Sequence, residues 1–372
     1  MAEEVYMVCQ DMSIGYLDRT TPSVVVKNSL SLRALKGEMV ALIGGNGIGK
    51  STLLRTLAGF QPPLSGELLI HNKPLAEYRA EELAREMSFV STEVVKVAHL
   101  TVREMVGLGR YPYTDWFGQL KDRDQEIIAK AIRDVGLSGY EDRQVSRISD
   151  GERQRVMIAR ALAQNTRIMV LDEPTAFLDI SNKYEIVRIL HQLVNEQGKC
   201  IIFSTHDLHT ALSMADRIWL MLEGEVVEGI PEVIAEKGYF DSLFPGNPQL
   251  MFDADKRDFS FRKKLIGTVR LSAKGSSERM VTRALDRLGF EIVGVAPEGL
   301  PTTEISCTEP ESLPDRPVLD QGIGSGDHPW VYLTVIQTAT GWSITLPGFT
   351  KEVETMEELC REVKLLTLQP ES

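Results

Sequence analysis

The chain has 372 residues and a formal net charge of -12, with 43% hydrophobic and 25% charged residues. This length predicts two or three domains, and the composition is that of an ordinary globular protein rather than a disordered or fibrous one. The acidic balance argues against a nucleic-acid partner, which would favour a basic surface.

The four cysteines are scattered along the chain, with no C-x-x-C pair. We therefore expect reduced thiols in a cytosolic protein, with neither a zinc site nor a disulfide framework. The first residues are acidic and no apolar h-region follows them, so no signal peptide is expected. No apolar run approaches the ~20 residues needed to span a bilayer, so a membrane role must come through a partner.

Up to about residue 250, short apolar strands alternate with helical segments, which indicates an α/β fold with a largely parallel sheet. Strands are predicted at 39–43, 87–90, 168–171, 200–204 and 217–222. Helices are predicted at 51–58, 80–86, 124–135, 152–163, 181–197 and 208–215. Residues 222–227 have the pattern of a hairpin that closes this domain.

After about residue 245 the composition changes, beginning with the loop signal Pro-Gly-Asn-Pro. We predict two domains, 1–255 and 256–372, the second of them a small α+β domain. Its expected strands are 265–271, 291–295, 303–306, 330–337 and 342–346, and its expected helices are 276–288 and 356–366. The run Gly-Ile-Gly-Ser-Gly at 322–326 lacks a strand–helix context, so we predict a flexible loop there rather than a nucleotide loop. Trp330, Tyr332 and Trp342 could line a pocket, although aromatics in paired strands usually form cross-strand core.

The most informative motif is the sequence GGNGIGKS at 44–51, between the predicted strand 39–43 and the predicted helix 51–58. It fits G-x-x-x-x-G-K-[ST], the P-loop, whose glycines let backbone N–H groups wrap a phosphate beside a helix N-terminus. Lys50 is expected to neutralise the β/γ-phosphates, and the Ser51 hydroxyl is expected to bind Mg²⁺. The residues predicted to hold the nucleotide here are Gly44, Asn46, Gly47, Ile48, Gly49, Lys50, Ser51 and Thr52.

Two further motifs follow buried strands. The strand at 168–171 ends in Asp172 and Glu173, which we expect to bind Mg²⁺ through water and to orient or deprotonate an attacking water, respectively. His206 follows the strand at 200–204 and is expected to reach the γ-phosphate as a sensor. A lone His at a strand end is more often a satisfied polar residue; the order of P-loop, acidic pair and strand-His favours the functional interpretation.

A third motif, ISDGERQR at 148–155, precedes a helix. Ser149 and Gly151 at a helix N-terminus make a second anion site, which could serve a nucleotide bound by another copy of the chain. Ser149 followed by Glu152 also fits an ordinary capping box, and both interpretations can hold together.

In combination these motifs resemble those of ATP-binding subunits of ABC transporters, over about residues 1–250. The resemblance implies a P-loop NTPase domain with a RecA-like core, a helical subdomain and an antiparallel β part. It also implies a homodimer that holds two Mg-ATP and a D-loop that ends in Asp179. His206 matches the family's switch histidine. Tyr16 falls where the family stacks an aromatic on adenine, a single-residue match that leaves a plain surface or core Tyr as an alternative.

Two departures from the family pattern stand out. Asp150 replaces the Gly of the usual signature Leu-Ser-Gly-Gly-Gln and brings a negative charge towards a phosphate site. Like charges ~8 Å apart at an effective dielectric of about 20 repel by about 2 kcal/mol, so we predict that Asp150 points away or is offset by a base such as Arg153. The family's Q-loop glutamine, which touches Mg²⁺ and the permease, is replaced by Thr92 on ungapped spacing; Thr92 or Glu93 is expected to substitute.

The segment LTVREMVGLGRYPY at 100–113 resembles the permease-contacting part of importers of iron–siderophore chelates, haem and cobalamin. A plain helix cap at Thr101 accounts for the helix but not for the Gly-Arg-Tyr-Pro-Tyr ending. We therefore expect the ATP-hydrolysing subunit of such an importer, at the cytoplasmic face of the cell membrane. Its expected partners are integral-membrane permease subunits and, indirectly, an extracytoplasmic substrate-binding protein.

Three other classes of protein fit the sequence less well. The alternative is a soluble ABC ATPase that serves iron–sulfur cluster assembly, which the ending at 109–113 argues against. A nucleic-acid-associated ABC protein fits poorly with the single P-loop and the acidic charge. A plain nucleotide kinase would give the 149–152 motif and His206 no role.

Overall fold

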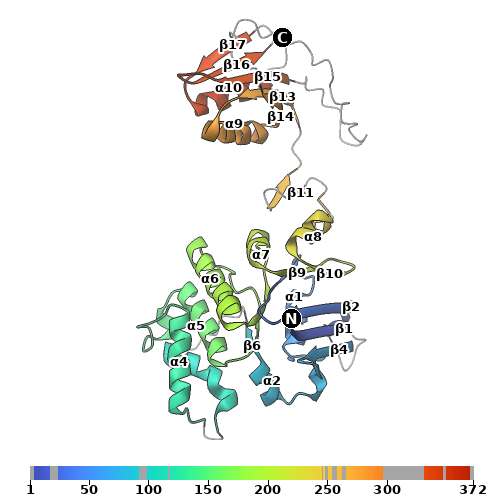
Figure 1. Cartoon of the computed structure of the whole chain (residues 1–372), viewed down its shortest axis with the longest axis vertical. Helices are drawn as coiled ribbons and strands as arrows, with labels where there is room; N and C mark the ends of the chain where they lie inside the picture. The colour runs from blue at the N-terminus through green and yellow to red at the C-terminus, as the bar shows by residue number, and fades with distance from the viewer. Residues whose placement is uncertain are drawn as a thin grey trace. The chain divides into compact units, whose positions relative to one another are not determined.

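The computed structural model describes residues 4–16, 24–91, 99–115, 118–244, 246–247, 250–253, 258–261, 265–295, 331–346 and 349–368. The chain divides into two compact units, Met1–Phe261 and Arg262–Ser372 (Figure 1). The boundary predicted between residues 255 and 256 lies outside the described residues, between strands β11 (Leu250–Asp253) and β12 (Asp258–Phe261), which pair as a hairpin. Among the described residues, no helix is both long and apolar enough to cross a bilayer.

A six-stranded sheet forms the centre of the first unit, in the order β10-β9-β3-β8-β7-β6. The strands β3 to β9 of this sheet pair in parallel, and only β10 runs antiparallel to its neighbour. The bounds are β3 (Met39–Gly44), β6 (Met87–Val90), β7 (Ile168–Leu171), β8 (Cys200–Ser204), β9 (Arg217–Met221) and β10 (Val226–Gly229). Every residue of β3, β7 and β8 is buried, which is why these strands read as continuous apolar runs in the sequence.

Strand β3 separates two hydrophobic cores. Met39, Ala41 and Ile43 pack into the core shared with the helices, whereas Val40 and Leu42 pack into the core shared with the second sheet. This alternation follows from the two-residue period of a strand. The second sheet is antiparallel, in the order β2-β1-β4-β5, and its strands are β1 (Val5–Tyr16), β2 (Val24–Leu35), β4 (Ser65–Ile70) and β5 (Lys73–Pro74).

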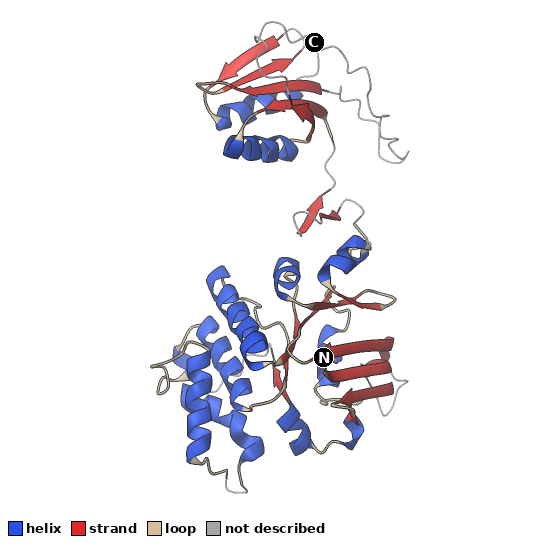
Figure 2. Cartoon of the chain, in the orientation of Figure 1, coloured by secondary structure: helices blue, strands red, loops and turns tan. Residues whose placement is uncertain are grey.

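The helices of the first unit gather mainly on one side of the central sheet (Figure 2). α3, α4 and α5 pack on one another as a helical subdomain, with the 3₁₀ segment η2 (Leu108–Tyr113) beside them. The α-helices are α1 (Lys50–Leu57), α2 (Ala80–Glu86), α3 (Val102–Gly107), α4 (Asp122–Asp134), α5 (Asp150–Ala163), α6 (Ile180–Gln197), α7 (Leu208–Met214) and α8 (Pro231–Glu236).

The second unit holds a five-stranded sheet in the order β14-β13-β15-β16-β17. β14 and β15 flank β13 in parallel, and β15, β16 and β17 form antiparallel pairs. The bounds are β13 (Gly267–Ser272), α9 (Gly275–Arg287), β14 (Phe290–Val295), β15 (Val331–Gln337), β16 (Trp342–Leu346), β17 (Phe349–Val353) and α10 (Met356–Leu368). α9 and α10 pack on one face of the sheet through a core that includes Val281, Leu359 and Trp342.

Trp342 is 6% exposed, which confirms the prediction that it belongs to the cross-strand core. Strand β17 was not predicted. The strand predicted at 303–306, the loop at 322–326 and Trp330 lie outside the described residues.

Candidate functional site

The P-loop connects the buried strand β3 to helix α1. Gly47 and Gly49 have φ values of 74° and 111°, a left-handed conformation that glycine adopts without the penalty of a Cβ. Gly49 occupies the N-cap position of α1 and supplies no side-chain cap, so the first N–H groups of the helix stay available to an anion. The loop therefore has the backbone geometry that a phosphate site requires.

Lys50 folds back onto this loop. Its Nζ donates to the carbonyl oxygens of Gly44 and Gly45 at 2.9 and 3.0 Å, and the residue is 6% exposed. Burial lowers the pKa of Lys50, and the nearby carboxylates of Glu173 and Asp172 oppose that shift. A bound polyphosphate would offer the ammonium group a stronger acceptor than the two carbonyls.

The acidic pair lies at the carboxyl end of β7, beside the strand β8 that pairs directly with β3. Ser204, the last residue of β8, donates its hydroxyl to Asp172 Oδ1 at 2.7 Å. The same hydroxyl oxygen accepts the Glu173 N–H at 2.8 Å. Glu173 has φ 47°, so its backbone is held in a rarely populated conformation at the point where the strand ends. Ser204 thus fixes both acids, a role that the sequence analysis missed.

His206 contacts the same acid. Its Nε2 pairs with Glu173 Oε1, and the two side chains are 45% and 26% exposed. The structure therefore brings His206 and Glu173 together at the carboxyl edge of the sheet, where the P-loop begins after β3. The His206 and Glu173 side chains are both partly exposed to solvent, so a substrate can reach them.

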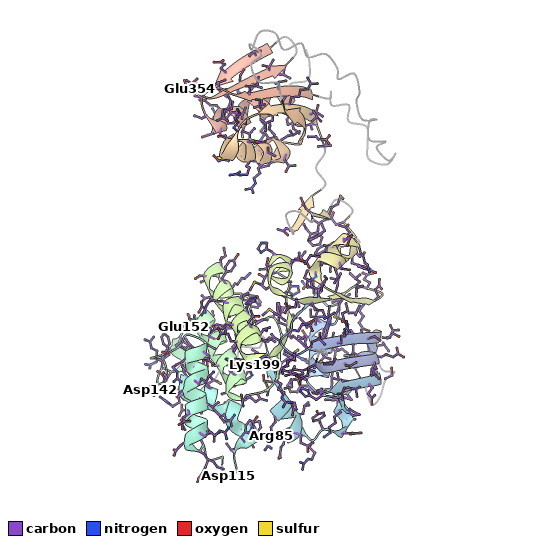
Figure 3. All side chains as sticks on the ribbon, viewed as in Figure 1. Arg85, Asp115, Asp142, Glu152, Lys199 and Glu354 are labelled. Carbon is purple, nitrogen blue, oxygen red and sulfur yellow. The ribbon has the colours of Figure 1, made fainter. Side chains whose placement is uncertain are left out.

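The start of α5 is capped as the sequence predicted. Ser149 N–H and Ser149 Oγ both donate to Glu152 Oε2, at 2.8 and 2.9 Å, and Glu152 N–H donates to Ser149 Oγ at 3.3 Å. The donated Ser149 N–H is the main reason that the pKa of Glu152 is lowered, so Glu152 is an anion at neutral pH. Figure 3 marks Glu152 at this helix start.

The predicted offset of the Asp150 charge is confirmed. Arg153 Nη1 donates to Asp150 Oδ1 at 2.6 Å. The Asp150 side chain is 79% exposed, and the ion pair spans one turn of α5. The guanidinium group therefore compensates the unusual acid within the motif itself.

Asp179 and Gly151 are connected through one side chain. Asp179 caps α6 by accepting from Asn182 N–H at 2.8 Å, and Asn182 Nδ2 donates to the second Asp179 oxygen at 3.1 Å. The Asn182 side chain also packs so closely on Gly151 that a Cβ at position 151 would collide with it. The two predicted motifs that would face a second copy are thus joined within one chain.

Tyr16 ends β1 and contacts the P-loop helix. Its hydroxyl hydrogen bonds to Thr52 Oγ1 at 2.7 Å, while the residue is 52% exposed. Adenine stacking on its ring stays a prediction. Thr92, the predicted Q-loop residue, lies outside the described residues.

The donor set suits Mg²⁺ held partly by a nucleotide. Among the described residues, no cluster of three His, Cys, Asp or Glu side chains forms a metal site by itself. Ser51 is exposed at the start of α1, and Asp172 keeps one oxygen that Ser204 does not occupy. One hydroxyl, one carboxylate and phosphate oxygens are the oxygen ligands that Mg²⁺ prefers.

The segment predicted to contact a permease proves to have two kinds of residue. Arg110 is 5% exposed: its Nε donates to Asp124 Oδ1 and its Nη1 to the Ala163 carbonyl, both at 2.8 Å. Its guanidinium carbon lies 4.0 Å from the centre of the Tyr113 ring. Tyr111, by contrast, is 76% exposed. Arg110 and Tyr113 therefore hold the segment, and Tyr111 is presented outward.

Known proteins share this arrangement. The family model for ABC transporters matches residues 27–176. An uncharacterised ABC transporter ATP-binding protein of Methanocaldococcus jannaschii is 37% identical over 236 residues, which cover 63% of this chain and 80% of that protein. The chain belongs to the ATP-binding subunits of ABC transporters.

Two named relatives of this ABC ATPase belong to iron transport systems. The iron(3+)-hydroxamate import ATP-binding protein of Bacillus subtilis is 35% identical, over 59% of this chain and 80% of that protein. The ferric enterobactin transport ATP-binding protein of Escherichia coli is 34% identical, over 63% of this chain and 85% of that protein. The predicted family and its ATPase activity are confirmed, and the iron–sulfur assembly alternative is not favoured.

Solved structures agree with this fold. The dimeric structure of a bacterial ABC transporter cassette superposes with a TM-score of 0.54 at 27% identity, over 60% of this chain and 98% of that one. An inward-facing transporter assigned to the metal-chelate type superposes with a TM-score of 0.58 at 25% identity, over 69% of this chain and 96% of that one. The predicted P-loop ABC ATPase fold is confirmed.

Proposed function

We propose that this ABC ATPase energises an importer of an iron chelate and is held at the cytoplasmic face of the cell membrane by its permease. The observation that carries the chemistry is the meeting of Lys50, Asp172, Glu173 and His206 at the carboxyl ends of β3, β7 and β8. The cargo class is supported by the names of relatives for hydroxamate and enterobactin chelates of iron. These names narrow the predicted cargo, which also included haem and cobalamin.

In the proposed ground state, the backbone N–H groups of the P-loop and Lys50 hold the β- and γ-phosphates of ATP. Tyr16 stacks on adenine, and its hydrogen bond to Thr52 ties that ring to the same helix. Ser51, with Asp172 through water, holds Mg²⁺, which when bound neutralises charge on the phosphate oxygens.

Hydrolysis needs Glu173 to change partner. In the structure Glu173 Oε1 contacts His206 Nε2. When ATP is bound, His206 turns to the γ-phosphate, and Glu173 is free to orient the attacking water and accept its proton. Ser204 keeps the Glu173 backbone in place during this exchange, since it accepts the Glu173 N–H.

Two copies would complete the site. Ser149, Gly151 and Glu152 of one copy meet the ATP held by the P-loop of the other, with Asp179 beside them. Solved relatives include a dimeric cassette and a dimeric state with bound ADP and phosphate. ATP favours the closed dimer and ADP does not, so turnover would move the attached permease through differential binding. A substrate-binding protein outside the membrane would deliver the chelate to that permease.

The test replaces the proposed base by its neutral isostere. Glu173→Gln should bind Mg-ATP, lose at least ~99% of steady-state ATP hydrolysis, and accumulate as a dimer that sedimentation velocity detects. Glu126→Gln, which neutralises an exposed acid on α4, is the matched control and should hydrolyse ATP normally. Normal turnover by Glu173→Gln would remove Glu173 from the catalytic role.

A further inference from the structure

Arg160, in the last turn of α5, is a partly buried arginine without an acid partner. It forms no ion pair and no side-chain hydrogen bond within the part of the chain that the structure describes. The other described arginines that are buried or partly buried each have a carboxylate oxygen within 4.0 Å: Arg110, Arg153, Arg155 and Arg217. Arg160 is therefore the exception among the described arginines that packing has removed from water.

The missing partner has an energetic cost. Burial lowers the pKa of Arg160, and no carboxylate opposes this shift. Lys50 shows the contrast, because the carboxylates of Glu173 and Asp172 oppose the same effect of burial on its pKa. A charge that leaves water without gaining a partner destabilises the fold. Arg160 is only partly buried, so an acid of another molecule can still reach it and offset this cost.

Arg160 lies where α5 meets η2 and the start of β6. A Cβ added to Gly109 would lie 2.1 Å from the Arg160 carbonyl oxygen, so the backbones of η2 and α5 are in close contact. Gln164, four residues after Arg160, lies on the same side of the helix. Its Nε2 donates to the carbonyl oxygens of Ala84 and Met87, at 2.6 and 2.9 Å. Arg160 is therefore on the side of α5 that faces η2, the end of α2 and the start of β6.

The surface of η2 is suited to a protein partner. Leu108 is 51% exposed and Tyr111 76%. The exposed cation beside this segment is already committed, because Arg85 donates to the Pro112 carbonyl from Nε and Nη2, at 3.1 and 2.9 Å; Figure 3 labels Arg85. This part of the surface therefore combines exposed apolar side chains with Arg160 as its unpaired positive charge.

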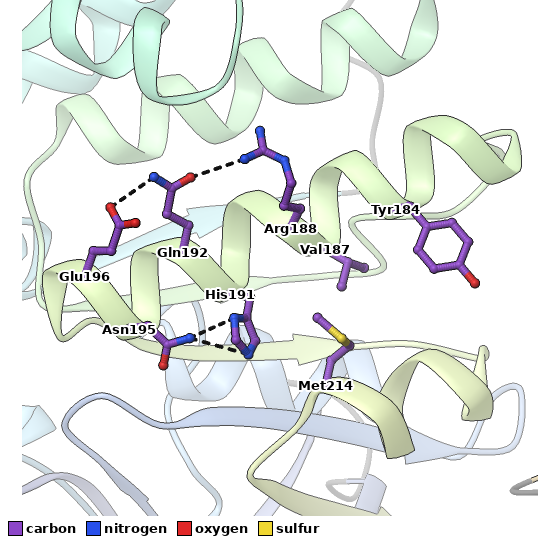
Figure 4. A pocket seen from close by; sticks show the side chains of 8 residues that line it. All are labelled: Tyr184, Val187, Arg188, His191, Gln192, Asn195, Glu196 and Met214. Carbon is purple, nitrogen blue, oxygen red and sulfur yellow. Dashed lines mark hydrogen bonds between the residues drawn. The ribbon is translucent and has the colours of Figure 1, made fainter.

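The groove between α6 and the end of α7 shows the opposite situation (Figure 4). Arg188 Nη2 lies 2.9 Å from Glu185 Oε1, and its Nη1 donates to Gln192 Oε1 at 3.4 Å. Asn195 Nδ2 lies 2.7 Å from His191 Nδ1. These polar side chains already have partners within the chain, so the groove does not require a charged partner as Arg160 does.

We propose that Arg160 receives a carboxylate from a cytoplasmic loop of the permease when the two proteins bind. The inference rests on the proposed function, which requires the permease as a partner. A carboxylate matches the guanidinium group in charge and in two-pronged hydrogen-bond geometry. The position of Arg160 selects the source of that carboxylate. Through Gly109, Arg160 contacts the segment at 100–113, which resembles the permease-contacting part of importers.

The nucleotide proposed at the start of α5 is too far away to be this partner. Its contacts there are Ser149 and Gly151. From Gly151 to Arg160 the helix rises roughly 14 Å, at about 1.5 Å per residue. The unpaired charge therefore serves a protein surface rather than that phosphate site.

The first experiment separates stability from binding. Arg160→Met removes the charge but keeps a long side chain that favours a helix. In the full chain alone it should raise the urea midpoint of unfolding, because no ion pair is lost. The probe for binding is the permease that co-purifies with the tagged chain, held in nanodiscs. Affinity for it should fall about tenfold or more, because the permease acid loses its partner.

Arg133→Met, at an exposed arginine of α4, is the matched control and should change neither quantity. A lower midpoint for Arg160→Met would show that Arg160 has a partner within the chain, and an unchanged affinity would show that the permease does not use Arg160. Either result overturns the inference and leaves the proposed function standing. An unmodified chain that recovers no permease would overturn the proposed function as well.

The second experiment identifies the acid by charge exchange. Arg160→Glu should weaken permease binding more than Arg160→Met does, since it brings two acids together. Each Asp and Glu of the permease's cytoplasmic loops is then replaced by Arg. One such replacement should restore binding to the Arg160→Glu chain but weaken binding to the unmodified chain. Failure of every replacement to restore binding would contradict the proposal.

Discussion

Replacing Ser204 by alanine should damage both stability and catalysis, because one buried hydroxyl serves two acids. The hydroxyl donates to Asp172 Oδ1 at 2.7 Å and accepts from Glu173 N–H at 2.8 Å, and Ser204 is fully buried. Removing it leaves a charged acceptor and a backbone donor without a partner, which costs about 2–3 kcal/mol of unfolding free energy. Looser placement of Glu173 should lower kcat by about 10- to 100-fold, or about 1.4–2.7 kcal/mol of activation free energy.

Urea denaturation of the nucleotide-free chain and steady-state ATPase kinetics measure the two effects. Ser88→Ala is the matched control, because Ser88 is 2% exposed and its hydroxyl accepts from Thr166 Oγ1 at 3.0 Å, away from the acids. The control should lose stability but keep kcat. If Ser204→Ala keeps kcat within about twofold of the unmodified chain, Ser204 does not position Glu173 for catalysis.

Three further predictions concern particular side chains. Arg110→Ala should lower the free energy of unfolding by about 3–5 kcal/mol in urea titrations, because it leaves the buried Asp124 without its ion-pair partner Arg110. Tyr111→Ala, at an exposed residue, should change that free energy by less than about 0.5 kcal/mol. Equal losses in the two variants would contradict the roles assigned to this segment. Burial lowers the pKa of Lys199 from 10.5 to about 8, so the unfolded chain binds this proton more tightly than the folded chain does. The charged Lys199 therefore destabilises the fold fully below about pH 8, and this effect is lost as the pH rises to 10.5. This pKa shift corresponds to a destabilisation of about 3 kcal/mol, which the hydrogen bond from Lys199 to the Thr166 carbonyl partly offsets. Lys199→Met should therefore raise the free energy of unfolding by about 1–2 kcal/mol at pH 7. A gain in stability that does not depend on pH would refute this cause. Asp150→Gly should leave the ATP-bound dimer of the Glu173→Gln chain within about twofold in affinity, because Arg153 already offsets the acid; a clear loss of dimer by sedimentation would show that Asp150 has a positive role.

The central strands could be predicted because a strand buried on both faces has an almost continuous run of apolar residues. The predicted bounds of β6, β7 and β8 agree with the structure, and all three are short apolar runs. β1 and β2 lacked such a signal. Their pairing is interrupted by register shifts at several points, which break the two-residue alternation on which strand prediction depends.

Some site residues could be predicted from local motifs, and others depend on contacts between residues far apart in the chain. The P-loop and the acidic pair are local motifs, so adjacent residues identify them. The role of Ser204 depends on the pairing of β8 with β7, and the burial of Arg110 depends on Asp124 and on the carbonyl of Ala163, 53 positions away. Contacts of this separation are set by tertiary packing, which no single-sequence pattern contains.

Purification of the tagged chain from detergent-solubilised membranes, with its partners identified by mass spectrometry, tests directly whether the chain serves an importer. Growth in iron-limited medium would favour expression of the transporter and its cargo-binding protein. We expect a multi-span permease in stoichiometric amount, together with iron-chelate uptake that Glu173→Gln abolishes. Recovery with soluble partners alone would contradict the importer and favour an assembly ATPase.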